Sequence, residues 1–435
     1  MLVRTLALTL AATTLLVPSS SPAEAAPDNF NPRRGPSFNN PLAEPYKRRT
    51  IFRKIVRSIN STQRGSEIDI FSWNFLTAEG ADVLIRAQRR GVRVRLLMDD
   101  RNLTEVPNPP FRRLRAELRR GNEDRPRTRR SYARVCDKTC RGRGGAAHTK
   151  MFLFSRVGKR KHVVMHGSAN FTLASTNNQW NDMFTHVGNR KVYRFAKRIF
   201  REAARDKPAA RPYLDKRFKN FRLIALPMGK QRDPVMGMLN RVRCRGATNT
   251  KSGRTRILIA PDVMRQDRGY ALGKRVRELW EQGCDVRIGY TVMGIDVGRM
   301  LRDDRGRGRV PMKHLVQDRD GDGEFDNYFH LKSMTIVGRY GKDRSGYALL
   351  NGSANWSRLA RVSDENLGIY RGKRHVRSYE EYLGYWYQNF PQDAPAYGST
   401  ARSVQRPLVF GFDENAVYED GRPLGYNPFS KMALD

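Results

Sequence analysis

Two segments of the chain carry the same polar side chains in the same order, each set within apolar sequence. Each has a histidine, a lysine two residues later and a Gly-Ser-Ala-Asn stretch, and the asparagine follows the histidine by 22 residues in one and 25 in the other. The residues are His148, Lys150, Ser168 and Asn170 in the first segment, and His330, Lys332, Ser353 and Asn355 in the second. One such set is common in strands and turns, but the same ordered set occurring twice indicates a functional site.

This combination of imidazole, ammonium and amide groups suits the chemistry of a phosphodiester. Side chains two residues apart on a strand lie on the same face, so each His-x-Lys pair points one way. Two sets that face each other would form one pocket, in which ammonium and amide groups hold the non-bridging oxygens and stabilise charge in the transition state. One imidazole would attack phosphorus while the other protonates the leaving oxygen.

The elements that must position these residues are duplicated as well. Strand, helix and strand patterns follow one another at 67–75, 78–91 and 92–100, and again at 255–261, 269–283 and 284–294. This alternation predicts βαβ units. We therefore expect an α/β fold of two pseudo-symmetric repeats, each a mixed β-sheet flanked by helices, that share one active site at their interface.

The composition of the chain predicts its organisation and its location. The expected parts are a signal peptide at 1–26, a polar N-terminal lead at 27–45, a first repeat at 46–206, a basic connector at 207–250, a second repeat at 251–390 and a C-terminal segment at 391–435. The start has a cationic residue, an apolar run at 6–17 and then small residues, which is typical of a secretory signal peptide. That run is shorter than the roughly 20 residues that span a bilayer, so we expect an extracellular protein without a transmembrane segment.

At the two motif sets the sequence resembles the phospholipase D superfamily, whose mark is a duplicated H-x-K-x4-D followed by G-S/G-x-N. The resemblance covers about residues 46–390. It implies a covalent phosphohistidine intermediate, no cofactor for catalysis, and one active site within one chain, hence a monomer. Carried over by position, His148 is the expected nucleophile and His330 the general acid and then base; this assignment follows the family, because the two sets are equivalent in sequence. The residues expected to hold the phosphate are Lys150, Lys332, Asn170 and Asn355, with Ser168 and Ser353 as supporting donors.

The sequence departs from the family pattern at one position in each repeat. Five residues after the motif lysine, where the family has Asp, this chain has Ser155 and Val337. Family members that remove adducts from DNA ends lack this Asp too, so activity is still expected. The family places a further acidic residue beyond each G-S-x-N, which orients the histidine of the opposite repeat. By position we assign Glu365 to His148 and Asp182 to His330; the alternative is that both belong to solvated acidic turns.

The chain is strongly basic. It contains 82 Lys and Arg against 43 Asp and Glu, a formal charge of +39 with a pI near 10.8, which suggests a polyanionic partner. A phospholipid surface is preferred over nucleic acid, and a generally basic exported protein is the alternative reading. Four cysteines in an exported chain favour two disulfides, most simply Cys136–Cys140 and Cys244–Cys284. Zinc at the first pair is an alternative that lacks a matching second pair of ligands.

An acidic loop just before His330 has the spacing of calcium loops. Its residues are Asp318, Asp320, Asp322 and Asp326. Because the twelfth position is Phe329 and not Glu, an EF-hand is not expected. The loop is predicted to be either a structural calcium site without a catalytic role or an acidic turn without an ion.

The predicted function is a secreted phospholipase D-type phosphodiesterase that hydrolyses, or transfers, the headgroup phosphodiester of a phospholipid. The alternative is an extracellular nuclease or another nucleic-acid phosphodiesterase of the same superfamily. A lipase needs an exposed apolar or aromatic rim at the pocket mouth, whereas a nuclease needs a continuous cationic groove. A degenerate anion-binding scaffold is disfavoured, because both histidines, both lysines and both asparagines are retained.

Overall fold

The structure is a computed structural model of the 435-residue chain. It describes residues 29–391 except 323, together with 418–419, 422–423 and 429. The predicted signal peptide and most of the predicted C-terminal segment lie outside these residues. Within the described ranges, no helix combines the length and apolar character needed to cross a membrane.

The first repeat is built on a seven-stranded mixed sheet, with the strand order β1-β10-β7-β6-β2-β4-β5. The strands are β1 (Gly35–Phe38), β2 (Glu67–Ser72), β4 (Arg93–Asp99), β5 (Tyr132–Cys136), β6 (Lys150–Val157), β7 (Arg160–Gly167) and β10 (Asp182–His186). The longer helices are α2 (Thr50–Asn60), α3 (Ala78–Arg89), α5 (Pro109–Arg120) and α7 (Arg190–Ala203), and the four-residue helices are α1 (Pro45–Arg48), α4 (Arg101–Thr104) and α6 (Ala174–Asn177). The pairs β2–β4 and β4–β5 are parallel, as the predicted βαβ unit requires, while β6 and β7 form an antiparallel hairpin.

The second repeat has a nine-stranded sheet, with the order β11-β12-β23-β22-β21-β14-β16-β18 and β13 paired to β21. The strands are β11 (Leu214–Arg217), β12 (Phe221–Ala225), β13 (Val242–Arg243), β14 (Arg256–Ala260), β16 (Asp285–Tyr290), β18 (Met312–His314), β21 (Ser333–Tyr340), β22 (Asp343–Gly352) and β23 (Asn366–Arg371). The helices are α8 (Pro234–Leu239), α9 (Gln266–Glu281), α10 (Ile295–Leu301), α11 (Leu359–Val362) and α12 (Lys373–Asn389). In both repeats the motif lysine lies at or beside the first residue of one hairpin strand, and the Gly-Ser-Ala-Asn stretch follows the other. The two hairpins, β6–β7 and β21–β22, therefore carry equivalent site residues.

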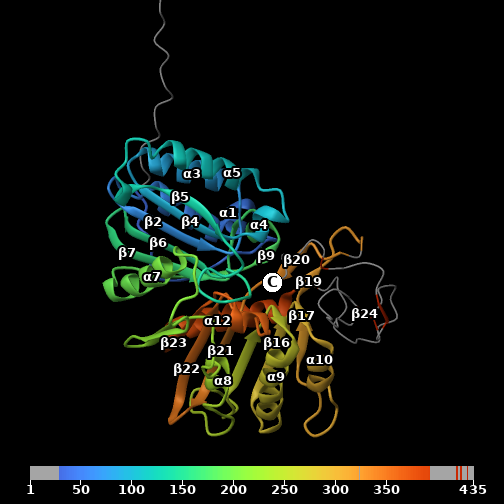
Figure 1. Ribbon diagram of the computed structural model, residues 1–435. Helices are drawn as coiled ribbons and strands as arrows, with labels where there is room; N and C mark the ends of the chain where they lie inside the picture. The colour runs from blue at the N-terminus through green and yellow to red at the C-terminus, as the bar shows by residue number, and fades with distance from the viewer. Residues whose placement is uncertain (1–28, 323, 392–417, 420–421, 424–428, 430–435) are drawn as a thin grey trace, which may run out of the picture.

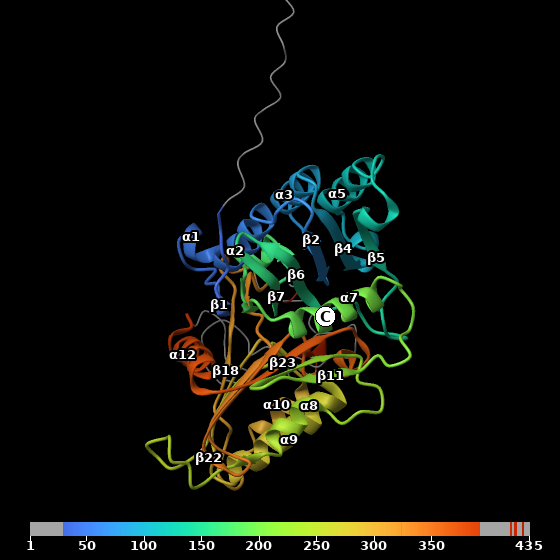
Figure 2. The ribbon, with the colours of Figure 1, turned by 90° about the vertical axis from the view of Figure 1, so that its left-hand side faces the viewer.

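The layers alternate as helix, sheet, helix, sheet and helix. Helices α2, α3 and α5 cover the outer face of the first sheet, and α8, α9 and α10 cover the outer face of the second (Figures 1 and 2). Helices α7 and α12 lie between the sheets, where Phe200 of α7 and Tyr379 of α12 share one buried cluster with residues of both sheets. The repeats are thus joined by a continuous core, and the predicted α/β fold of two mixed-sheet repeats is confirmed.

Local sequence explains the individual elements. Ile51, Ile55 and Ile59 recur on one face of α2 and are at most 4% exposed. The side chain of Thr77 caps α3 by accepting a hydrogen bond from the backbone N–H of Gly80 at 3.2 Å. Patterns of this kind depend only on neighbouring residues, so they are readable before the fold is known.

The predicted lead and connector also contribute strands to the sheets. In the lead, β1 pairs antiparallel with β10 at the edge of the first sheet. In the connector, β11 and β12 form a hairpin that extends the second sheet from β23. Both segments therefore belong structurally to the sheets that they adjoin.

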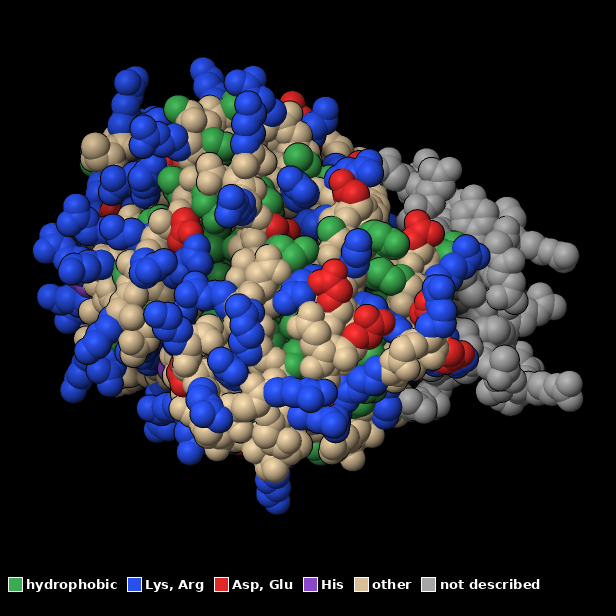
Figure 3. Space-filling view, turned by 90° about the horizontal axis from the view of Figure 1, so that it is seen from below, with side chains coloured by type: hydrophobic (Ala, Val, Ile, Leu, Met, Phe, Trp, Pro, Cys, Tyr) green, Lys and Arg blue, Asp and Glu red, His purple; other side chains and the backbone are tan. Residues whose placement is uncertain are grey.

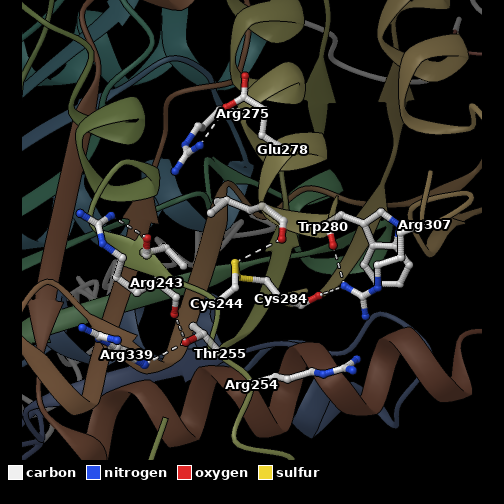
Figure 4. Close-up of a disulfide and its surroundings, with 12 residues drawn as sticks. Arg243, Cys244, Arg254, Thr255, Arg275, Glu278, Trp280, Cys284, Arg307 and Arg339 are labelled. Carbon is white, nitrogen blue, oxygen red and sulfur yellow. Dashed lines mark hydrogen bonds and ion pairs between the residues drawn. A yellow bond between two sulfur atoms is a disulfide. The ribbon is translucent and has the colours of Figure 1, made fainter. Parts of the chain in front are cut away.

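Both predicted disulfides are present. Cys136–Cys140 closes a short loop after β5, and Cys244–Cys284 joins the end of β13 to the turn between α9 and β16. Around the second bridge, the Arg307 guanidinium donates to the carbonyls of Trp280 and Cys284, each at 2.6 Å, and stacks over the Trp280 ring (Figure 4). The pairing of Cys136 with Cys140 leaves no thiolate there for the alternative zinc site.

Candidate active site

Each motif lysine is folded back onto its own histidine at the start of a hairpin. His148 and Lys150 lie where β6 begins, 1% and 0% exposed, and the Lys150 Nζ donates to the carbonyl oxygen of His148 at 3.0 Å. The same Nζ lies against the His148 Nε2, on the side of the ring that would meet a phosphate. In the second repeat, the Lys332 Nζ donates to the carbonyl oxygen of His330, also at 3.0 Å, and both residues are equally buried.

The His148 imidazole is held by a carboxylate from the second repeat. Its Nδ1 lies 2.8 Å and 2.9 Å from the two carboxylate oxygens of Glu365, and both side chains are buried. The Ser353 hydroxyl donates to the same carboxylate. The Nδ1–H therefore points to Glu365 and the Nε2 points away from it, as a nucleophile requires. The structure places Glu365 against His148, as the sequence predicted.

The His330 imidazole is held by a neutral amide from the first repeat, and here the prediction was wrong. The Nδ1 of His330 lies 2.8 Å from the Oδ1 of Asn181, and Asp182 is not its partner. The Asn181 Nδ2 donates to the carbonyl of Ser175 and to the Oε1 of Gln179, both at 3.1 Å. These two bonds fix the orientation of the amide, so Oδ1 is the acceptor and His330 carries its proton on Nδ1.

The error for Asp182 comes from strand alternation. The backbone N–H of Asp182 donates to the Ser168 hydroxyl at 3.0 Å, just as that of Asn366 donates to the Ser353 hydroxyl at 2.9 Å. Asp182 therefore corresponds to Asn366, and the residue before it corresponds to Glu365. Because neighbouring strand residues face opposite sides of a sheet, the Asp182 side chain points away from His330.

Asp182 instead forms a buried contact between the repeats. Its carboxyl group accepts hydrogen bonds from the Asn351 amide at 2.7 Å and the Tyr379 hydroxyl at 2.6 Å. Burial raises the pKa of this carboxyl group, although its hydrogen bonds oppose the shift. Its role in the structure is to join the sheets and α12.

The serines and asparagines of the motifs are also buried at this junction. Ser168 donates to Asn181 Oδ1 at 2.8 Å, so each motif serine supports the group that orients the histidine of the opposite repeat. Asn170 is 4% exposed and its Oδ1 accepts the backbone N–H of Asn74 at 3.4 Å, while Asn355 is 1% exposed and its carbonyl oxygen accepts from Arg268. Each half-site is thus completed by residues of the other repeat.

A carboxylate that sequence analysis did not single out lies at the second lysine. The Asp262 Oδ2 is 2.6 Å from the Lys332 Nζ, and both side chains are at most 3% exposed. In the first repeat, Lys150 instead lies 5.7 Å from the centroid of the Trp73 ring. The interval from strand to helix is the same in both repeats, 72 to 78 and 260 to 266, so Asp262 corresponds to Asn74. The two lysines therefore have different electrostatic surroundings.

The motif Asp that the chain lacks would lie away from these groups. Ser155 is five residues beyond Lys150 on β6, about 16 Å along the strand at 3.3 Å per residue. Its hydroxyl accepts the backbone N–H of Glu67 at 2.8 Å, and Val337 is packed in the core between the sheets. The substitutions change the structural end of each hairpin and leave the histidine–lysine end intact.

Three of the predicted calcium ligands lie close together. Asp318, Asp320 and Asp326 each offer an oxygen, and these oxygens lie within 4.8 Å of one another. Beyond them the chain forms β20 (Asn327–Phe329), which belongs to a small three-stranded sheet and pairs in parallel with β9 (Gln179–Trp180) of the first repeat. The geometry suits an oxygen-ligated cation, and calcium binding there stays a prediction.

Comparisons with known proteins agree with this fold. A family model described as "Cardiolipin synthase, PLD-like domain" matches residues 55–203. A polyphosphate kinase from Porphyromonas gingivalis superposes with a TM-score of 0.55 at 15% identity, covering 87% of this chain and 53% of its own. A phosphatidylserine synthase from Haemophilus influenzae Rd KW20 superposes with a TM-score of 0.50 at 15% identity, covering 82% of this chain and 86% of its own. The chain thus spans about half the length of the kinase, and at this identity the likenesses show the fold alone. No curated protein matches the sequence.

The fold and the paired half-sites define a two-repeat α/β enzyme of the phosphodiesterase type. Residues 55–203 match the PLD-like domain model, and the second copy of the motif lies in the repeat that packs against them, so the resemblance to the phospholipase D superfamily is confirmed.

Proposed function

We propose that this chain is a phosphodiesterase that acts through a covalent phosphohistidine on His148. The observation that carries the proposal is the unequal support of the imidazoles, with the Glu365 carboxylate at His148 and the Asn181 amide at His330. A carboxylate stabilises the positive charge that builds on an imidazole when its Nε2 bonds to phosphorus. A neutral amide orients the ring without favouring its charged form, which suits a group that must both give and take a proton.

The proposed reaction has two displacements at phosphorus. In the first, the His148 Nε2 forms a bond to phosphorus, the P–O bond to the leaving group breaks, and the protonated His330 gives its Nε2 proton to that oxygen. In the second, His330 takes a proton from water, the resulting hydroxide attacks phosphorus, and the P–N bond breaks to free His148. An alcohol in place of water would give transfer instead of hydrolysis. Lys150 and Lys332 would hold the non-bridging oxygens, together with Asn170 and Asn355.

The headgroup phosphodiester of a phospholipid is one substrate candidate, as the sequence predicted. Support comes from apolar side chains exposed close to both motifs. Leu173, three residues after Asn170, is 46% exposed, and Val362, three residues before Glu365, is 45% exposed. Apolar surface of this kind beside both half-sites would contact acyl chains or the interior of a headgroup layer.

Nucleic acid is the second candidate, and a different observation favours it. A large cationic groove with aromatic rings lies between α7 and the β11–β12 hairpin. A cationic groove with aromatic rings favours a nucleic-acid ligand, although this groove lies about 16 Å along β6 from Lys150. The predicted export would place either substrate outside the cell, and N-terminal sequencing of protein recovered from culture medium tests that part of the proposal.

The proposal is tested on protein that starts after residue 26, with a His148→Ala control and excess EDTA. Phospholipid vesicles, single- and double-stranded DNA, and RNA are incubated in parallel. Headgroup release that is lost in the control variant supports the phospholipid candidate, and strand cleavage with the same dependence supports the nucleic-acid candidate. Activity of equal size in the control variant would reject His148 as the nucleophile.

A second test separates the two histidines. A His330→Asn variant should accumulate an acid-labile phosphohistidine, because the step that needs the general base is slowed. A His148→Asn variant should form none. Trapping of phosphate on His330 in the second variant would reverse the assignment.

A further inference from the structure

A strongly cationic hollow of the described structure lies away from the catalytic residues. We name it the flank groove; it has a volume of about 1470 Å³ and lies between α7 and the β11–β12 hairpin. Figures 1 and 2 both show these elements side by side at the junction of the repeats. Ser155 and Glu67 line the groove, at the ends of β6 and β2 that are remote from His148. The groove is therefore separate from the active site, about 16 Å along β6 from Lys150.

The cations of the flank groove far outnumber its carboxylates. Nine Lys or Arg residues and two acidic residues line it. Both acidic residues are already in ion pairs, Glu67 with Lys197 and Asp215 with Arg222. Cations that converge on one concavity repel one another, and a polyanion in the groove would relieve that repulsion.

The cations are arranged along a line. Lys191, Arg194, Arg198 and Arg201 recur at intervals of three and four residues, so they form one stripe along α7, about 15 Å long. All four are exposed. The hairpin contributes Lys216, Arg217 and Lys219 to the same groove. A linear array of this kind matches the repeated charges of an extended phosphate backbone.

Two smaller hollows continue the cationic surface on either side of the hairpin turn. One, of about 660 Å³, is lined by six Arg or Lys residues and no acidic residue. The other, of about 440 Å³, is lined by six Arg or Lys residues and Asp233, which is paired with Arg268. Asn220 and Phe221 line all three hollows, so the cationic surface is continuous around the turn. Figure 3 shows Lys and Arg crowded toward the side of the molecule on which Figure 1 places α7.

Aromatic rings accompany the cations. Phe195 and Phe218 are both partly exposed in the groove, with ring centroids 6.4 Å apart, and Phe218 stacks on Phe221 at 4.7 Å. Unpaired bases stack on such rings, whereas a double helix keeps its bases inside. A membrane surface is broad and does not enter a concave slot, so its headgroups would meet only the rims.

From these features we infer that the flank groove is a binding site for single-stranded nucleic acid, separate from the catalytic pocket. The α7 stripe and the hairpin hold the phosphates, and Phe195 and Phe218 stack with bases. The inference does not depend on the proposed catalysis. If it holds, it places nucleic acid ahead of phospholipid as the substrate class.

Two matched variants test the inference in the full mature chain. The groove variant is Lys191→Gln, Arg194→Gln and Arg201→Gln. The control variant is Arg86→Gln, Arg115→Gln and Arg119→Gln, which removes the same charge from exposed positions of α3 and α5. Binding of a fluorescent 12-nucleotide single-stranded DNA of mixed sequence is followed by anisotropy, in EDTA and in a His148→Ala background that prevents cleavage.

The groove variant should bind the oligonucleotide at least about tenfold more weakly than the parent. The slope of the logarithm of its association constant against the logarithm of the salt concentration should become shallower by about 2, since each of the three lost phosphate contacts accounts for roughly 0.7. The control variant should lose less than half as much of either. A Phe218→Ala variant should lose at least about fivefold for single-stranded DNA and nothing for inorganic polyphosphate. Melting temperatures of all variants should match the parent, because the changed side chains are on the surface.

Three results would overturn the inference. Equal losses in the two triple variants would show that net charge alone binds DNA. Polyphosphate binding as tight as DNA binding, with no effect of Phe218→Ala, would show a polyanion site without preference for bases. Groove-dependent binding to phosphatidylglycerol vesicles without binding to the oligonucleotide would show a membrane site. Hydrolysis of bis(p-nitrophenyl) phosphate by the groove variant with His148 intact should be unchanged, so failure of this inference is distinguishable from failure of the proposed catalysis.

Discussion

Replacement of Glu365 by Gln tests the central chemical claim, because it removes a charge from His148 and little else. The amide has the size of the carboxylate, and its Oε1 can still accept from the His148 Nδ1. The Ser353 hydroxyl, which donates to the carboxylate in the native protein, can accept from the new NH₂ group. The orientation and tautomer of His148 should therefore survive, while the stabilisation of its positive charge is lost.

The expected magnitude follows from the burial of the pair. His148 and Glu365 are 1% and 2% exposed, so solvent screens their interaction little. Hydrogen bonds to charged groups contribute about 1.5–3 kcal/mol, twice or more the contribution of neutral ones. If that difference of about 1–1.5 kcal/mol acts mainly in the transition state, kcat should fall by roughly 5- to 13-fold. Because the interaction strengthens as the phosphohistidine forms, kcat/KM should fall by the same factor.

The assay is steady-state hydrolysis of a small chromogenic phosphodiester, with the phosphoenzyme trapped by quenching in alkaline denaturant, in which the P–N bond is stable. Asp364→Asn is the matched control, since Asp364 is the neighbouring buried carboxyl group and accepts backbone N–H groups of Cys140 and Arg141, at 2.6 and 3.1 Å, instead of a histidine. It should keep activity within a few-fold of the parent. A folded Glu365→Gln enzyme with kcat within twofold of the parent would refute the role given to this carboxylate.

Three further predictions concern charge. Asp262→Asn leaves Lys332 without its carboxylate partner, and inhibition by inorganic phosphate should become about tenfold tighter, because one negative charge has left the pocket; an unchanged inhibition constant would remove Asp262 from the site. Burial lowers the pKa of His166 to about 4, so the imidazole takes up a proton more readily in the unfolded chain than in the folded one. The free energy of unfolding should therefore fall by about 3 kcal/mol as the pH drops from 6.5 to 4. The melting temperature of His166→Asn should therefore fall less over that range than the parent's, a comparison that cancels the opposite contribution of Asp364, whose pKa burial raises to about 7. Calcium, followed by calorimetry, should bind the native chain and not Asp320→Asn, while EDTA should leave the initial rate of diester hydrolysis unchanged.

The sequence predicted those parts of the fold that depend on local patterns. The βαβ units were readable because α3 and α9 bury one apolar stripe each and are followed by parallel strands. The two hairpins were readable because the motif residues recur in the same order on them. The edge strands β1 and β11 were missed, since their four-residue sequences form strands only where a neighbouring sheet edge accepts them.

The site residues also divide into those that sequence patterns predict and those that depend on how the strands pair. Glu365 was predicted as the partner of His148 because the family pattern places an acidic residue beyond each G-S-x-N stretch, where it orients the histidine of the opposite repeat. Asn181 was missed, since a shift of one residue on a strand moves the side chain to the opposite face, and sequence spacing does not fix that register. Asp262 was missed because it lies 70 residues before Lys332 in the chain and meets it only through pairing of β14 with β21.

The positions of the carboxylates make the two half-sites different, although their motif sequences are equivalent. The two carboxylates that contact the motif side chains are placed differently, since Glu365 lies on a histidine and Asp262 lies on a lysine. The charges of the two motif lysines are balanced by those of Glu365 and Asp262. The net charge of these side chains therefore becomes positive only when an imidazole is protonated or phosphorylated. Such a pocket favours a phosphodiester with one negative charge over a phosphomonoester with two. The same charge balance would assist release of the product, because the monoester product carries one more negative charge than the diester and the pocket does not neutralise it.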